Sequence, residues 1–313
     1  EIMPSLVGSE MCIRDRYNED KVYSKEFVMM VDMNIFDQQF WKDAWDNDPN
    51  TQDKRMKRAG LGNPDAPGFE KWAENFNKNS FTEESQKRTK RIMSWIEKQT
   101  GAFKNLSILD VGAASGVFSI PFAKEGAKVT SLEPSTVLHE MLKDNAQHYD
   151  ASIETINQSF ESISASDLNN VDFVFASMCP AVTTWEAVQK AIDIANQFVY
   201  VSLIAGPKEN SIVDEVTAFL EMKPSPMTAD MYYLMQLLYC NNYTYETLIE
   251  HHTQHTEKSV EEVMQQLPSW LKEVEIEINH QQMESIEQYL QDKYGDNVPL
   301  TTGGKFGKVL IHL

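Results

Sequence analysis

The sequence has 313 residues, of which 42% are hydrophobic and 24% are charged. This length and composition, with six Trp and fifteen Phe, are typical of a folded globular protein and exclude an intrinsically disordered chain. Acidic residues outnumber basic ones by 47 to 28, and the net charge of −19 disfavours nucleic acids and anionic membranes as partners.

Cysteine usage and hydropathy indicate an intracellular setting. The three cysteines, Cys12, Cys179 and Cys240, form no disulfide framework and match no common zinc spacing, so we expect no metal. No stretch approaches the roughly 20 apolar residues that span a bilayer, and the first residues lack the order of a secretory signal. We therefore expect a soluble, cytoplasmic protein, and the sequence leaves its oligomeric state open.

The N-terminal hundred residues are predicted to be mainly helical. Residues 4–16, PSLVGSEMCIRDR, have no regular period and resemble a translated sequencing adapter, so we treat 1–16 as a non-native or disordered tail. Apolar residues at spacings of three and four predict helices over 28–45 and 85–101, on either side of the Gly- and Pro-rich loop 61–68. Residues 17–100 are expected to form a helical N-terminal cap.

One concentrated basic run lies in the second of these helices and consists of Lys87, Arg88, Lys90 and Arg91. Such a run at helical spacing is typical of a solvated helix face. One patch cannot supply the distributed phosphate contacts that nucleic-acid binders use, so nucleic acid is not an expected partner.

From Leu106 the hydrophobic period changes from that of helices to an alternation of short strands and helices. The expected strands are 107–111, 128–134, 171–178 and 198–206, and the helix-length segments between them are 118–126, 136–149 and 183–197. This alternation predicts a parallel sheet with helices on both faces.

The C-terminal part continues with helices and two further strands. Helices are expected over 211–222, 229–242, 258–271 and 282–295, and strands over 243–255 and 305–313. We expect one core over 101–313, with helical insertions at about 207–242 and 257–295.

A loop of small residues follows the first predicted strand. The strand ends in Asp110, and the loop that opens the next helix is made of Gly112, Ala113, Ala114, Ser115 and Gly116. Small residues allow a cofactor to approach the backbone closely at the carboxyl ends of parallel strands. Glu133, at the end of the next strand and about 20 residues on, is placed to accept hydrogen bonds from both hydroxyls of a ribose.

The glycine spacing separates two classes of cofactor. A dinucleotide fingerprint would need glycines at 112, 114 and 117, but Ala114 and Val117 stand at the second and third positions. The run DVGAASG instead resembles motif I of the class I, Rossmann-like methyltransferases that use S-adenosylmethionine, with Ala114 at the middle glycine. The resemblance implies an α/β fold, a Rossmann-like seven-stranded, mostly parallel sheet with helices on both faces, plus the helical cap.

The resemblance also implies roles for individual residues. Asp110 would lie near the methionine amino group, the backbone of 112–116 would line the cofactor, and Glu133 would bind the ribose. Pro134 would flank the adenine. Ser159 and Phe160 match the place where the family reads adenine, although the usual acidic residue is absent there. Ser177 and Met178, at the end of the fourth expected strand, would face the methyl donor.

Candidate acceptor-side residues are fewer and have an alternative interpretation as core residues. Phe76 and Trp72, in a segment similar to the one before motif I, are candidates to fold over the cofactor. Cys179 follows the strand end that would line the transfer site, and a buried inert thiol is the alternative. Tyr232 and Tyr233 lie where this class builds substrate walls.

The expected function is direct methyl transfer from S-adenosylmethionine to a small-molecule acceptor. This reaction needs no obligatory protein nucleophile, so we name no catalytic residue. A binding or scaffold protein with a degenerate Rossmann-like core and a nicotinamide-dependent oxidoreductase are the alternatives. The acceptor and its reacting atom are left open.

Overall fold

The computed structural model describes residues 35–58, 60, 69–168 and 170–313. The expected tail 1–16 and the loop 61–68 lie outside the described residues, as does the first part of the helix predicted over 28–45.

Four helices precede the sheet: α3 (Gln38–Asn47), α4 (Gln52–Arg58), α5 (Phe69–Ser80) and α6 (Glu83–Thr100). The side chain of Asp37 caps α3, and that of Thr82 accepts a hydrogen bond from the backbone of α6. Helix α6 ends at Gly101, whose φ of 81° is one that glycine adopts without steric cost. The helix expected over 85–101 is therefore confirmed.

Seven strands form one sheet in the order β3-β2-β1-β4-β5-β7-β6. The strands are β1 (Ser107–Val111), β2 (Lys128–Leu132), β3 (Ile153–Ile156), β4 (Val171–Ser177), β5 (Ala195–Asn210), β6 (Thr244–Lys258) and β7 (Val298–His312). Strands β1 to β5 run parallel to one another, whereas β7 runs antiparallel to both β5 and β6. The seven-stranded, mostly parallel sheet is confirmed.

The remaining helices connect these strands or follow them. They are α7 (Ser119–Lys124), α8 (Thr136–His148), α9 (Trp185–Ile194), α10 (Ser211–Phe219), α11 (Asp230–Cys240), α12 (Val260–Glu273) and α13 (His280–Tyr294). Each helix expected from residue 118 onward is present, and Ser259 begins α12 with a capping box that also involves Glu262. None of the helices in the described ranges is long and apolar enough to cross a membrane.

The two faces of the sheet bury separate hydrophobic cores. Helices α6 and α7 cover one face, where the buried side chains include Ile92, Ile96, Phe122, Phe173, Phe175 and Tyr200. Helices α3, α9 and α11 cover the other face, where they include Trp45, Val174, Val188, Val199, Leu234 and Leu237. Among the N-terminal helices, α3 packs on α11, whereas α6 packs on the opposite face of the sheet.

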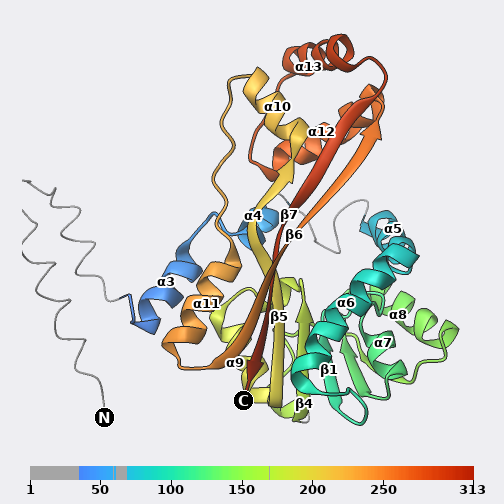
Figure 1. The fold of residues 1–313 in the computed structure, drawn as a ribbon, viewed down its shortest axis with the longest axis vertical. Coiled ribbons are helices and arrows are strands. Elements are labelled where there is room, and N and C mark those ends of the chain that lie inside the picture. Colours follow the sequence, from blue (N-terminus) through green and yellow to red (C-terminus); the bar gives the residue numbers. More distant parts are fainter. Residues whose placement is uncertain (1–34, 59, 61–68, 169) are drawn as a thin grey trace, which may run out of the picture.

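A third core lies beyond the end of the parallel strands. There β5, β6 and β7 extend past the other strands and carry α10, α12 and α13, as the upper part of Figure 1 shows. Its buried side chains include Val213, Val216, Val263, Leu267, Ile286, Leu290, Val298 and Leu300. The two expected insertions therefore differ in place: α10 and α12 share this lobe, whereas α11 returns to the main sheet and packs on α3.

Candidate functional site

The loop after β1 has a backbone that requires small residues. Gly112 has a φ of 69° and Gly116 a φ of 90°, both in the left-handed region that favours glycine. A β-carbon on Gly112 would lie 2.4 Å from Sγ of Cys179, and one on Gly116 would lie 2.7 Å from Cδ1 of Leu142. Ala114, which replaces the middle glycine of the motif, also has a positive φ, of 48°.

Glu133 fastens this loop to the end of β2. Its Oε2 accepts a hydrogen bond from the Ala114 amide over 2.8 Å, and its Oε1 accepts one from the Ser135 amide over 2.9 Å. Burial raises the pKa of Glu133, although these two hydrogen bonds act in the opposite direction. Because a carboxylate oxygen has two lone pairs, each oxygen keeps acceptor capacity for a ligand hydroxyl.

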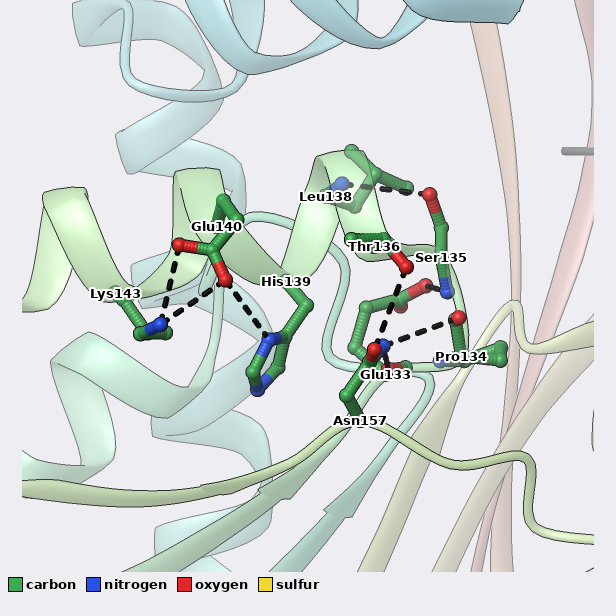
Figure 2. Close-up of polar contacts among 9 residues, drawn as sticks. All are labelled: Glu133, Pro134, Ser135, Thr136, Leu138, His139, Glu140, Lys143 and Asn157. Carbon is green, nitrogen blue, oxygen red and sulfur yellow. Dashed lines mark hydrogen bonds and ion pairs between the residues drawn. The ribbon is translucent and has the colours of Figure 1, made fainter.

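The backbone around Glu133 is held by a residue from the next strand end. The side-chain amide of Asn157 donates to the backbone carbonyls of Glu133 and Pro134, as Figure 2 shows for Pro134. Ser135 caps α8 by accepting from the Leu138 amide. Pro134 is exposed between these fixed points, on the surface beside Glu133.

Asp110 is hydrogen-bonded to Ser119, the first residue of α7. Its Oδ2 accepts a hydrogen bond from Oγ of Ser119 over 2.5 Å, and Ser131 donates in turn to Ser119 over 2.7 Å. Burial, with the added charge of Glu133, raises the pKa of Asp110 to about 7. The acid of motif I is thus part of a buried polar cluster that fixes the start of α7 to the sheet.

The other predicted cofactor residues lie at different depths. Ala113 and Ser115 are buried in the loop, and the Ser115 hydroxyl has no hydrogen-bond partner among the described residues. Ser159 is half-buried and bonds with Ser162 after β3. Phe160 is only 2% exposed and packs in the core of the α9 face, so its ring serves as a core side chain here.

The turn after β4 is fixed by hydrogen bonds to β5. Met178 has a φ of 52°, and its amide donates to both the carbonyl and the hydroxyl of Ser202. The hydroxyl oxygens of Ser177 and Ser202 are 3.2 Å apart. Cys179 is buried against Gly112, and burial raises the pKa of its thiol to about 12, so it is a weak nucleophile at neutral pH.

The predicted aromatic residues Trp72 and Phe76 belong to α5, which contacts α8. Trp72 and Phe76 stack with their ring centroids 5.3 Å apart, and Trp72 is 51% exposed. Asn145 of α8 donates to the side chain of Asn77 and to the carbonyl of Ser115, each over 2.8 Å. Helix α5 is therefore joined to the loop through α8.

The two predicted tyrosines lie on the opposite face of the sheet. Tyr233 stacks on Trp45 of α3, and its hydroxyl donates to Asp48 over 2.7 Å. Tyr232 makes an edge contact with Trp41. Their surroundings are those of residues that join α11 to α3.

Two sizeable cavities lie beside α6. One, of about 530 Å³, lies between α6, α7 and Tyr149. The other, of about 980 Å³, lies between α6, the end of β4 and the middle parts of β5, β6 and β7. Both Ser177 and Met178 line it. Glu133 lines neither, so the larger cavity adjoins the predicted transfer position rather than the ribose position.

Several residues of the larger cavity were not predicted from the sequence. They are Arg88 and Arg91 of α6, Tyr200 and Ser202 of β5, Glu250 and His252 of β6, and Lys308 of β7. Arg88 and Arg91 are exposed, as expected for a solvated helix face, but they line a cavity as well. The signal available in the sequence was the spacing Phe-x-Phe-x-Ser in β4 and Phe-x-Tyr-x-Ser in β5, which places each serine beyond an aromatic pair.

Comparison with known proteins identifies the central part of the chain. Residues 108–199, from β1 to β5, match the family model described as a methyltransferase domain. No curated protein matches the sequence.

Three solved structures are similar in fold. Magnesium protoporphyrin IX methyltransferase from Synechocystis, solved with bound S-adenosylhomocysteine, has 14% identity and a TM-score of 0.41 over 70% of this chain and 92% of that chain. A putative methyltransferase from Bacillus halodurans has 12% identity and a TM-score of 0.43 over 70% and 97%. TehB from Haemophilus influenzae has 13% identity and a TM-score of 0.41 over 76% and 65%. The family model thus shows a methyltransferase domain over residues 108–199, which form the parallel strands β1 to β4 and the first part of β5 in the seven-stranded sheet.

Proposed function

We propose that this chain transfers a methyl group from S-adenosylmethionine directly to a small-molecule acceptor. The observation that carries the proposal is the position of Glu133, a buried carboxylate at the end of β2 that is hydrogen-bonded to the glycine loop. The matched methyltransferase domain includes both this carboxylate and the loop.

The residues present fit the proposed cofactor. A ribose with two adjacent hydroxyls needs two acceptors, and each oxygen of Glu133 has a lone pair beyond its bond to Ala114 or Ser135. The positive φ values of Gly112 and Gly116 give a loop without projecting side chains, and the Ser115 hydroxyl is a buried polar group with no partner in the described part of the chain. We assign cofactor binding to the loop 112–116, Glu133 and the neighbouring Pro134.

The acceptor is proposed to occupy the larger cavity. Its volume of about 980 Å³ is within the range of small-molecule pockets, and Ser177 and Met178 at its edge belong to the strand end next to the loop. The net charge of −19 speaks against nucleic acid as the acceptor.

The protein's contribution to the reaction is alignment. When bound, S-adenosylmethionine supplies an electrophilic sulfonium methyl group. The loop and Glu133 would hold the cofactor, and the hydrogen bonds from Met178 to Ser202 fix the turn after β4, where the acceptor would meet the methyl group. Cys179 forms no covalent intermediate in this proposal, because its thiol stays protonated.

Thermal unfolding of the full-length chain tests the cofactor assignment. S-adenosylmethionine and S-adenosylhomocysteine should each raise the unfolding midpoint in a concentration-dependent way, because a ligand that binds only the folded state stabilises it. NAD at the same concentrations is the control and should leave the midpoint unchanged. A shift with NAD alone would favour the oxidoreductase alternative, and no shift with any of the three would favour a scaffold protein.

A further inference from the structure

The floor of the larger cavity is a polar row that crosses three strands. On the α6 face of the sheet, Ser177 pairs with Ser202 in the register of β4 and β5, and Ser202 pairs with Lys308 in that of β5 and β7. The row directly before it contains Phe175, Tyr200 and Leu310, all fully buried. The sheet face thus changes from apolar to polar at the point where the cavity opens.

Lys308 brings a buried positive charge to this floor. It is only 4% exposed, and its ammonium forms an ion pair with Glu250 of β6. Burial alone would raise the pKa of Glu250, but Lys308 and the charge of Arg91 hold that pKa below its usual range. Glu250 is therefore a carboxylate at neutral pH, beside the buried Lys308.

The same carboxylate serves more than one cation. The Arg91 guanidinium lies 3.4 Å from Glu250 and 3.1 Å from Nε2 of His252, and that imidazole nitrogen lies 3.4 Å from Glu250. One carboxylate thus faces two cations, Lys308 and Arg91, with the imidazole of His252 beside them, and a single negative charge cannot neutralise both cations. The group has positive charge in excess.

Arg88 adds to this excess. It lines the cavity one helical turn before Arg91, and within the described ranges it makes no hydrogen bond or ion pair. The cavity wall has five Lys and Arg side chains: Lys87 and Lys208 pair with Glu83 and Glu273, two carboxylates outside the wall, whereas Arg88, Arg91 and Lys308 stand against the two wall carboxylates, Glu84 and Glu250. This balance is the reverse of that of the whole chain, whose net charge is −19.

We infer that the methyl acceptor is a small molecule with an oxyanion, a carboxylate or a phosphate, which pairs with Arg88 and Arg91. Guanidinium groups suit this role because they present several donors in a plane that matches both kinds of oxyanion. The acceptor would extend from the two arginines across Ser202 toward Ser177 and Met178. The identification of the bound molecule as the methyl acceptor rests on the proposed function, but binding of an anion at this site can be tested without catalysis.

Fluorescence titration with two matched probes tests the anion site. Anilinonaphthalene sulfonate has a fixed negative charge, and phenylnaphthylamine has the same rings without it. We expect Arg88→Gln combined with Arg91→Gln in the full-length chain to weaken binding of the sulfonate at least tenfold and to leave binding of the neutral probe unchanged. Both arginines are exposed, so the folded structure should persist, which circular dichroism checks.

Lys71→Gln combined with Lys98→Gln is the matched control, because it removes two positive charges from α5 and α6 without touching the cavity wall. It should leave the affinity for the sulfonate probe within twofold of the wild type. Equal losses in both double variants, or equal affinity of the wild type for the two probes, would overturn the inference. A parallel titration with S-adenosylhomocysteine separates this outcome from failure of the cofactor assignment, since both double variants should bind it normally.

Discussion

The sulfur of Cys179 lies directly over the backbone of Gly112, so close that a β-carbon on the glycine would be 2.4 Å from it. The turn after β4 therefore packs on the loop after β1, and the two strand ends most central to the proposed site support each other. Gly112 is needed for two separate reasons, its φ of 69° and this contact.

A double-mutant cycle separates these two reasons. Gly112→Ala should lower the free energy of unfolding by about 1–3 kcal/mol, through overpacking and an unfavourable φ. Cys179→Ala should recover part of this loss, with a coupling of at least about 0.5 kcal/mol in urea unfolding. Gly295→Ala is the control: its φ is also positive, 63°, but the added carbon would meet nothing within 4 Å. Simple additivity between positions 112 and 179 would show that the contact is not tight.

The buried position of Asp110 predicts an unusual dependence of stability on pH. Its pKa is raised from 3.8 to about 7, so between these values the folded state holds a proton that the unfolded state has lost. The unfolding free energy of the wild type should therefore fall, relative to that of Asp110→Asn, as pH rises from 4 to 7. Each unit of pKa difference corresponds to about 1.4 kcal/mol.

Asp172→Asn provides a control of opposite sign. Hydrogen bonds from the backbone and hydroxyl of Ser107 lower the pKa of Asp172, so its stabilising contribution is lost as pH falls below about 4. Urea unfolding at several pH values measures the unfolding free energy of the wild type relative to each variant. Relative to Asp110→Asn it should fall as pH rises from 4 to 7, and relative to Asp172→Asn it should rise as pH rises toward about 4. Parallel pH profiles of Asp110→Asn and the wild type would contradict the account of the buried cluster.

Thiol labelling tests the assignment of Cys179 as an inert core residue. Cys179 is buried with a pKa near 12, whereas Cys240 at the end of α11 is half-buried. In a Cys12→Ser background, iodoacetamide at pH 8 should label Cys240 well before Cys179 in the folded protein. The two should react at similar rates in urea. Faster labelling of Cys179 in the native state would point to an accessible, activated thiol.

Much of the fold could be predicted from the sequence because its elements have strong local periods. The apolar runs of β1, β2, β4 and β5 and the amphipathic helices between them were identified directly. Strand β3 was the exception: it has only four residues, and its half-buried pattern at the sheet edge gives little signal. The split of α3 and α6 between two faces depends on tertiary packing, which no local pattern records.

The candidate site was predictable only in part, for the same reason. Asp110, the loop 112–116 and Glu133 lie in two short segments with recognisable spacing, whereas the floor of the cavity is built by strand register. Ser202 and Lys308 are adjacent across β5 and β7 but more than a hundred residues apart in the chain. Tyr232 and Tyr233 are candidates by position in the sequence, and their packing with α3 follows from tertiary structure alone. The cofactor roles of individual residues and the cytoplasmic location stay predictions.

Calorimetric titration of the full-length chain with S-adenosylhomocysteine, beside Glu133→Ala and Glu133→Gln, tests the central claim most directly. The wild type should bind, and both variants should lose at least tenfold in affinity, about 1.4 kcal/mol, because the ribose acceptor is removed or uncharged. Glu154→Ala, an exposed carboxylate on β3, is the control and should bind normally. Absence of binding by the folded wild type, or equal affinity in the folded Glu133 variants, would contradict the assignment of this site.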